Sequence, residues 1–240
     1  MVEIKKGREP RKLLQYRMQK NASYKDMPSD IKQEVIEHLL AEQGHLCAYC
    51  MKKIESGYGK HRATIEHCTP QAGTTEAERL NYRNMVAVCW GNRDADSNED
   101  KTCDARRGSL PTAEQTMKKV DVFDGRTLSL IAYGSDGTIF STDTGVDEDL
   151  NKRLNLNCES LDLKACRLAA LLALQGKIED RYPAKTAPKE YFQKLLSHYQ
   201  EQGEYKTPYC GILIAWLKHK LGLSQYAEVK RCTSRQNSRL

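Results

Sequence analysis

The stretch that decides the fold runs from Leu46 to Gly108. It begins LCAYCMKKIESGYGKHRATIEHCTP (residues 46–70) and ends NMVAVCWGNRDADSNEDKTCDARRG (residues 84–108). Cys47 and Cys50 form a C-x2-C knuckle, a spacing that lets two thiolates reach one ion from a tight turn. Cys89 and Cys103 are the best candidates for the second ligand pair. The sequence therefore predicts a structural zinc ion here. Buried free thiols are the alternative, above all for Cys103, because its distance from Cys89 is not a knuckle spacing.

A second constellation lies between the two cysteine pairs. Hydrolysis of a phosphodiester needs a water nucleophile, a base that takes its proton and a cation that stabilises charge. His67 can be the base, and Glu66 can be an oxygen ligand of Mg²⁺. Asp104 can supply a second oxygen from the start of a short helix that continues through residues 105–108. Glu-His alone is a weak signal, since a surface histidine is the default, but the four flanking cysteines strengthen it.

Basic side chains near this constellation suggest contacts with a polyanion. Arg106 and Arg107 would lie beside the scissile phosphate, where bidentate contacts are favoured, and Lys101 would be a third contact with nucleic acid. Further basic residues crowd both ends of the chain, and the alternative is that they are solvated tails. They are Lys5, Lys6, Arg8, Arg11, Lys12, Arg17 and Lys20, and Lys230, Arg231, Arg235 and Arg239.

Composition restricts the cellular setting. The 240 residues carry a formal charge of +6 and include nine cysteines. No apolar run approaches the roughly 18 residues that span a bilayer, and the N-terminus lacks the apolar segment of a secretory signal. Cysteines without an export signal indicate reduced thiols. We therefore expect a soluble, cytoplasmic protein without a membrane partner.

The pattern of apolar residues predicts mostly helices. One helix is expected from an N-cap at Ser29 to Gly44, and residues 52–54 and 63–65 are expected to form a hairpin through a turn at 56–59. Residues 85–88 form a short apolar run. Beyond Pro111, residues 120–123, 128–132 and 138–141 suggest a small β-element. Three helices follow at about 161–181, with residues 161, 165, 168, 172 and 178 on its apolar side, 189–202 and 210–221.

These residues resemble the HNH endonuclease signature. The matches are Cys47-x2-Cys50, Glu66-His67-x2-Pro70, residues 84–89 (NMVAVC) and residues 103–108 (CDARRG). The resemblance implies that His67 is the general base, that Glu66 and Asp104 hold a catalytic Mg²⁺ or Mn²⁺, and that Asn84, less favourably Asn81, holds the ββα loop. Glu66 replaces the usual Asp or His, and Asp104 the usual Asn or His. A long loop, residues 90–102, separates the last two cysteines.

A narrower resemblance links the chain to PtuB-type HNH proteins of Septu and retron-linked antiphage defence systems. It rests on residues 4–10 (IKKGREP), 154–157 (LNLN) and 208–211 (PYCG). It implies a partner ATPase of the ABC/SMC-like class (PtuA-type) and, in retron-linked systems, a reverse transcriptase with its RNA–DNA hybrid. The implied fold is α+β: mainly helical, with a zinc-stapled ββα-metal insert and a minor hairpin.

On this basis we expect three domains. These are a basic arm and helix at residues 1–45, a ββα-metal nuclease core at 46–112, and a β-hairpin with a helical partner-docking region at 113–240. The expected activity is cleavage of nucleic acid, DNA before RNA or tRNA. A non-catalytic zinc-stapled binding module and a helical adaptor are the alternatives. Asp104 discriminates between the nuclease and the zinc-stapled module, because a pure zinc module does not need that carboxylate beside Glu66-His67.

Overall fold

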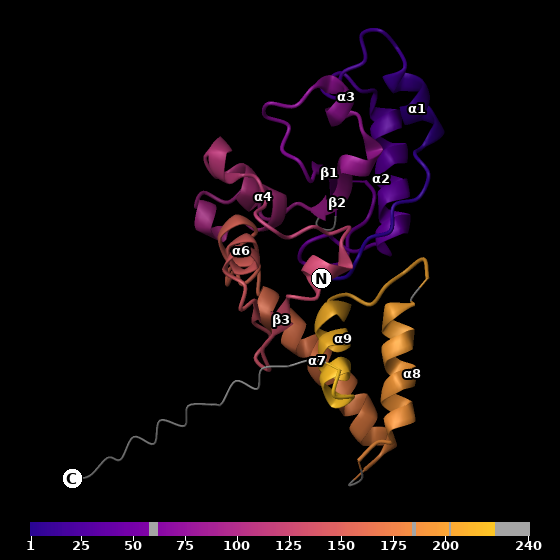
Figure 1. The fold of residues 1–240 in the computed structure, drawn as a ribbon, viewed down its shortest axis with the longest axis vertical. Coiled ribbons are helices and arrows are strands. Elements are labelled where there is room, and N and C mark those ends of the chain that lie inside the picture. Colours follow the sequence, from indigo (N-terminus) through magenta and orange to yellow (C-terminus); the bar gives the residue numbers. More distant parts are fainter. Residues whose placement is uncertain (58–61, 184–185, 202, 224–240) are drawn as a thin grey trace, which may run out of the picture.

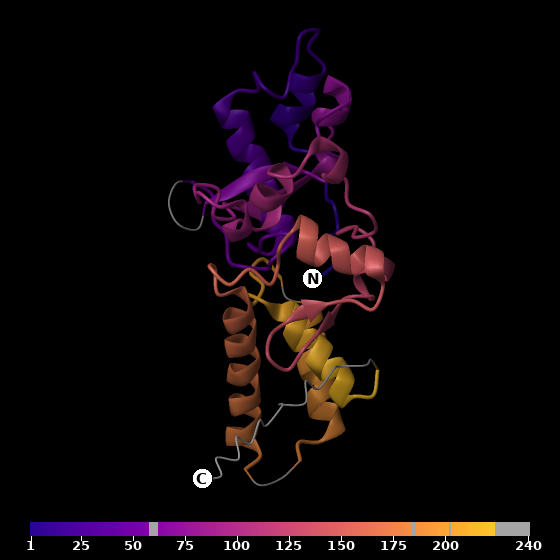
Figure 2. The same cartoon turned by 90° about the vertical axis from the view of Figure 1, so that its left-hand side faces the viewer.

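The computed structural model describes residues 1–57, 62–183, 186–201 and 203–223 and has an elongated, mainly helical α+β fold with two small sheets (Figure 1). In chain order the elements are α1 (Arg11–Arg17), α2 (Ser29–Gln43), β1 (Ala63–His67), α3 (Glu76–Arg79), β2 (Met85–Cys89), α4 (Cys103–Gly108), α5 (Gly125–Leu128), β3 (Ala132–Tyr133), β4 (Ile139–Phe140), α6 (Thr144–Glu148), α7 (Leu163–Arg181), α8 (Lys189–Gln200) and α9 (Cys210–Lys220). Helices α1–α3 surround the first sheet at one end of the long axis, and α7–α9 form the other end (Figures 1 and 2).

The sheet beside the cysteines pairs β1 with β2. The two strands are antiparallel, with Ala63 opposite Cys89 and His67 opposite Met85. The predicted hairpin between residues 52–54 and 63–65 is therefore wrong, because Lys53 forms only an isolated bridge with Leu46. Residues 63–67 instead pair with β2, every residue of which is buried. Part of the predicted turn, residues 58–61, lies outside the described residues.

Helix α2 packs against both strands of this sheet. It ends as predicted, with Gly44 in the left-handed conformation at φ +64°, where a side chain would be strained. The predicted N-cap is wrong: Ser29 is the first helical residue, and Pro28 precedes it without a side-chain cap. The N-terminal segment, predicted as a basic arm, includes the helix α1, which buries Leu13 and Tyr16.

Gln43 is a buried polar link between α2 and the sheet. Its amide nitrogen donates to the carbonyls of Leu46 (2.7 Å) and Ala87 (2.8 Å), and its amide oxygen accepts from the nitrogen of Ala87 (2.7 Å). These bonds fix the end of α2 against β2 and the start of the knuckle. Helix α2 therefore helps to position two candidate zinc ligands: Cys47, which follows Leu46, and Cys89, which ends the strand that contains Ala87.

Replacing Gln43 by leucine is expected to lower the free energy of unfolding by about 3 kcal/mol, because the carbonyl of Leu46 and the nitrogen of Ala87 lose these hydrogen bonds, whereas the carbonyl of Ala87 keeps one from the nitrogen of Ala48. Urea denaturation would measure the change. The matched control is Gln33→Leu on the same helix, whose amide bonds only Glu37 and is expected to change stability by less than about 0.5 kcal/mol. Equal effects of the two substitutions would contradict this role of Gln43.

The second sheet is smaller than the sequence suggests. Strands β3 and β4 contribute two residue pairs, Ala132 with Phe140 and Tyr133 with Ile139. The strand predicted at 128–132 is wrong in its first part, because Asp124 caps the short helix α5 by accepting from the nitrogen of Arg126. Residues 118–120 instead donate three backbone hydrogen bonds to the buried carboxylate of Asp149.

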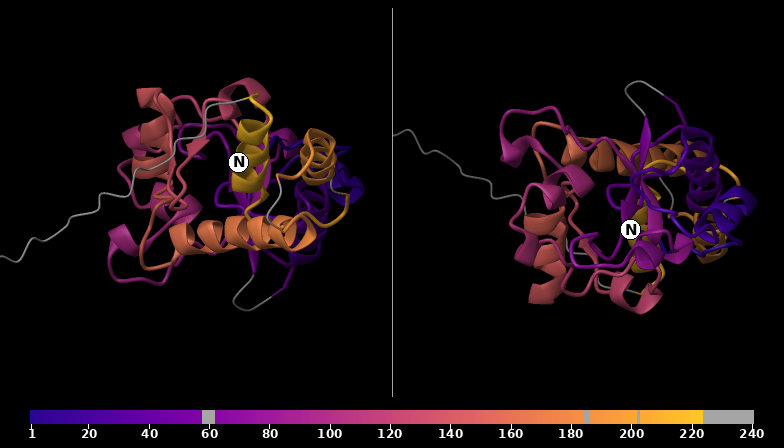
Figure 3. Two further views of the ribbon diagram at one scale, coloured as in Figure 1. Left: turned by 90° about the horizontal axis from the view of Figure 1, so that it is seen from below. Right: turned by 90° about the horizontal axis from the view of Figure 1, so that it is seen from above.

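The three predicted C-terminal helices are present within two residues of their expected bounds as α7, α8 and α9. Helix α9 contacts both α7 and α8, and the end-on views of Figure 3 show the three helices together. The predicted apolar face of α7 is mostly wrong: Leu172 is exposed, whereas Leu171 and Arg167 are buried. Arg167 is buried because its guanidinium donates to the carbonyls of Gly137 and Leu156 and to the Asn157 side chain.

Buried apolar residues from all three predicted segments form one contiguous cluster, which includes Leu13, Val86, Leu154 and Leu217. The segment before α4 is tied to the C-terminal half, since the nitrogen of Cys103 and the hydroxyl of Thr102 both donate to the carbonyl of Leu154. The three-domain division remains a prediction. No helix in the described ranges combines the length and apolar character needed to cross a membrane.

Candidate metal centre and hydrolytic site

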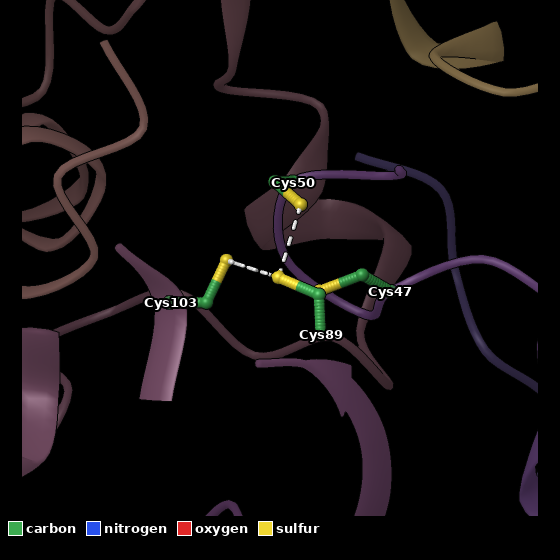
Figure 4. A group of neighbouring side chains, drawn as sticks. All are labelled: Cys47, Cys50, Cys89 and Cys103. Atoms are coloured by element: carbon green, nitrogen blue, oxygen red, sulfur yellow. Dashed lines mark hydrogen bonds between the residues drawn. The ribbon is translucent and has the colours of Figure 1, made fainter. Parts of the chain in front are cut away.

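The four predicted cysteines converge on one point. Their sulfur atoms all lie within 4.8 Å of one another, and all four residues are buried (Figure 4). The measured separations are 3.8 Å for Cys47–Cys103, 3.7 Å for Cys50–Cys89 and 3.8 Å for Cys89–Cys103. Thiolates about 2.3 Å from a tetrahedral zinc ion stand about 3.8 Å apart. The cluster therefore has the dimensions and the soft donor set to hold a structural metal ion such as zinc.

Local backbone geometry delivers each thiol. The knuckle closes because the nitrogen of Met51 donates to the carbonyl of Cys47 (3.1 Å), with Met51 in the left-handed conformation at φ +62°. Cys89 ends β2, and Cys103 begins α4 at φ +55°, held by its hydrogen bond to Leu154 (2.8 Å). Positive φ is costly for a residue with a side chain and persists only where its surroundings enforce it. Such strain at Cys103 is consistent with a ligand position.

A pair of carboxylates lies near this centre. Glu66 on β1 and Asp104 on α4 are close enough to share a hydrogen bond, and Glu66 is buried. Burial and then the Asp104 charge raise the pKa of Glu66 well above its usual range, although the Arg107 guanidinium opposes them. Adjacent carboxyl groups in such a place bind either a proton or a cation.

Each carboxylate also has an arginine partner. Arg107 is buried and forms an ion pair with Glu66, and it donates to the carbonyls of His67 and Cys68. Arg93 pairs with Asp104. The Glu66 oxygen that forms no hydrogen bond, Oε1, is the atom paired with Arg107, so it can take a cation only once that arginine moves away. The donor set of hard oxygens fits a divalent cation such as Mg²⁺ or Mn²⁺ once Arg93 and Arg107 move away from the two carboxylates.

His67 is held in the tautomer that a general base requires. Its Nε2 lies 2.8 Å from the carbonyl oxygen of Arg79, which can only accept, so Nε2 carries the proton. Nδ1 is then the lone-pair nitrogen, and it accepts from the Gln71 amide at 3.0 Å. Burial lowers the pKa of His67 below its ordinary 6.5. The imidazole is therefore neutral near pH 7, and its basic nitrogen is bonded to the exposed Gln71.

Asn84 anchors the turn that follows His67. Its side-chain oxygen accepts from the nitrogen of Thr69 (2.8 Å), and its carbonyl accepts from the nitrogen of Cys68 (2.9 Å). The amide nitrogen of Asn84 also reaches the carbonyl of Thr69 (3.4 Å). These three contacts join the end of β1 to the start of β2. Asn81 instead caps the short turn Tyr82–Asn84.

The residues predicted to contact nucleic acid have protein partners in this conformation. Arg106 donates to the carbonyls of Lys152 and Asn98 and pairs with Glu99, and Arg107 is buried as described above. Lys101 bonds the side chain of Asn98. Their contacts with phosphate remain a prediction that requires these partners to be released.

The N-terminal basic cluster lies among the described residues, and several of its members have protein partners. Lys6 is partly buried against Glu42 (2.8 Å), with its ammonium 3.6 Å from the centroid of the Tyr82 ring. Lys12 pairs with Asp30, and Arg17 pairs with Glu9. The C-terminal cluster at residues 230–239 lies outside the described residues.

Sequence reasoning missed Tyr24. Its ring meets the His67 ring edge-on, with centroids 4.5 Å apart. Burial, followed by the charges of Glu66 and Asp104, raises the pKa of Tyr24 to about 12. Tyr24 therefore lies beside both parts of the candidate site. Nothing in its sequence neighbourhood marks it, because this contact exists only after the N-terminal segment folds over β1.

Comparison with protein-family models and with curated proteins found no match to this chain. The site is therefore assessed on its own geometry.

The titration of His67 gives a testable pH dependence. Because its pKa is lowered in the folded state, the unfolded chain binds the proton more readily. The stabilisation by the neutral imidazole is complete above about pH 6.5 and is lost as the pH falls through the folded pKa. Glu66 has the opposite sign, since its raised pKa favours the folded state in acid, but this contribution is common to wild type and a His67 variant.

We therefore expect the free energy of unfolding of wild type to fall more steeply between about pH 7 and pH 5 than that of His67→Asn. Urea denaturation across this range would measure both slopes. Identical slopes would show that His67 does not titrate abnormally.

Proposed function

We propose that this chain is a metal-dependent endonuclease of the HNH type, in which a zinc-stapled core positions His67 to act with Glu66 and Asp104. The observation that carries the proposal is the state of His67. A neutral imidazole with a fixed tautomer lies next in sequence to a carboxylate that is itself paired with a second one. This is the arrangement that base-assisted hydrolysis at a divalent cation needs.

The residues have separate roles in this proposal. The Arg79 carbonyl orients the imidazole, and Nδ1 of His67 takes the proton of the attacking water once the Gln71 amide has moved away. Glu66 and Asp104 would hold Mg²⁺ or Mn²⁺, which when bound would neutralise charge on the phosphate. Arg93 and Arg107, released from these carboxylates, could then donate to phosphate oxygens.

The placement in antiphage defence rests on the sequence resemblance to PtuB-type proteins. It supplies the proposed ABC/SMC-like ATPase partner and, in retron-linked systems, a reverse transcriptase with its hybrid. Helices α7–α9 are the proposed docking region, and Leu172 is an exposed apolar residue on α7. DNA is the preferred substrate, and RNA or tRNA is the second.

A zinc-stapled binding module without catalysis is the second candidate. It is favoured by one specific observation: both ring nitrogens of His67 and both carboxylates already have protein partners. A module of this kind would need no rearrangement.

Asp104→Asn separates the two candidates, because an amide keeps the shape of the side chain but loses its charge. We expect Mn²⁺ affinity to fall at least about tenfold and metal-dependent cleavage to fall about a hundredfold. Calorimetric Mn²⁺ titration and a gel cleavage assay measure these effects. The control is Asp96→Asn, at an exposed position in the same loop region. Unchanged Mn²⁺ binding in Asp104→Asn would contradict the proposed ligand.

A further inference from the structure

A cavity lies beside the cysteine centre. It has a volume of about 420 Å³, within the usual range for small-ligand sites, and its walls include Lys52, Arg62, Trp90, Asn92 and Asp94. Cys50 and Cys89 also line it, so the zinc centre would form its floor. The metal chemistry proposed above makes no use of this cavity.

An aromatic platform dominates the cavity. The indole nitrogen of Trp90 donates to Asp94 at 2.6 Å, which fixes the ring. The Arg62 guanidinium lies 3.3 Å from the centroid of this ring, and that of Arg93 lies 5.0 Å from it. Nucleobases that are not paired stack on aromatic rings and on arginine planes, and every base offers the required face.

The charge around the platform is positive. Among the described residues, neither Lys52 nor Arg62 forms a salt bridge, and Asp94 is the one acidic wall residue. Arg93 connects the platform to the candidate hydrolytic site, since the same side chain pairs with Asp104. One side chain therefore contacts both the Trp90 platform and the candidate hydrolytic site.

We infer that the Trp90 cavity binds an unpaired nucleotide of single-stranded DNA or RNA, with its base stacked on the Trp90–Arg62 pair and its phosphate near Lys52. This inference rests on the proposed function and names its substrate class: single strands, or loops and ends of structured polymers. Duplex DNA does not present a base to such a platform unless it is unstacked.

Tryptophan emission gives a direct readout, because the chain has only two tryptophans. Trp216→Phe removes the other, which is buried in α9 against Phe192. In this background, a twelve-nucleotide single strand of DNA or of RNA should quench Trp90 emission saturably. The matching duplex should bind at least about tenfold more weakly. A stronger effect of either polymer identifies the preferred source of the nucleotide.

The neighbouring residues Lys52 and Lys53 provide the charge control. Lys52→Ala and Arg62→Gln should each weaken single-strand binding about threefold or more in fluorescence anisotropy, and Trp90→Ala about tenfold. Lys53→Ala removes the same charge one residue away from the cavity, where Lys53 pairs with Glu55, and should have no effect. Zinc content checks that each variant retains its core.

Single-strand binding that leaves Trp90 emission unchanged, absence of binding, or equal weakening by Lys52→Ala and Lys53→Ala would each overturn the inference. Its failure is distinct from that of the proposed function. If the cavity variants cleaved as fast as wild type, the proposed role of the cavity would be excluded and the nuclease proposal would stand. If single strands quenched Trp90 emission but were not cleaved in Mg²⁺ or Mn²⁺, the nucleotide-binding cavity would stand and the nuclease proposal would be excluded.

Discussion

Replacing Cys103 by serine is expected to unfold the region around β1, β2 and α4. A structural zinc ion contributes on the order of 10 kcal/mol to small zinc-dependent folds, which is as large as the whole stability of a typical domain. Loss of one thiolate opens the tetrahedral set, and a buried hydroxyl does not replace it. Cys103 also starts α4, which carries Asp104 and Arg107, so the carboxylate pair should be lost with it.

Elemental analysis, circular dichroism and urea denaturation measure this effect together. Wild type purified without chelator should contain about one zinc per chain, and Cys103→Ser should contain little and show a lower urea midpoint. Cys166→Ser is the matched control, because Cys166 is a half-buried cysteine of α7 outside the sulfur cluster. If Cys103→Ser retained wild-type stability and zinc content, the cluster would not be a structural metal centre.

Substitution of His67 by asparagine is expected to reduce metal-dependent cleavage by about 10²- to 10⁴-fold, the usual contribution of a general base. The amide of asparagine takes the place of Nδ1 and can still bond the Gln71 side chain, but it loses the Nε2 bond to the Arg79 carbonyl and cannot take a proton from water. The lowered pKa of His67 also predicts that the rate of wild-type cleavage is highest near neutral pH and falls in acid as the imidazole becomes protonated.

Single-turnover cleavage under saturating Mg²⁺ measures the His67 effect on the chemical step. His38→Asn is the control, since His38 is exposed on α2. Circular dichroism and zinc content must match wild type for the comparison to count. Equal cleavage rates for wild type and His67→Asn would exclude His67 as the base.

Local spacing predicted the cysteine cluster and the helices α2, α4 and α7–α9, but not α1, α5 or α6. The C-x2-C knuckle and two further cysteines were sufficient because metal ligation imposes a fixed geometry on side chains that are distant in sequence. Gly44 marked the end of α2, and the bounds of α7–α9 were predicted within two residues, although the apolar face of α7 was mostly wrong.

Tertiary contacts account for what the sequence did not predict. The sequence predicts that Arg107 is a cation beside a substrate phosphate, but in the fold it is buried against Glu66. Arg167 reads as the polar side of α7, yet it faces inward because carbonyl groups of two other segments accept from it. The pairing of β1 with β2, and the approach of Tyr24 to His67, likewise join segments between which no local pattern exists.

Cleavage by the zinc-loaded wild-type chain tests the central proposal most directly. Supercoiled plasmid and total tRNA would be incubated with Mg²⁺ or Mn²⁺ and, in parallel, without a divalent cation. The proposal predicts cutting of at least one polymer that requires the added cation and that His67→Ala abolishes. A folded, zinc-containing protein that binds both polymers and leaves both intact with either cation would contradict it and would favour the non-catalytic binding module.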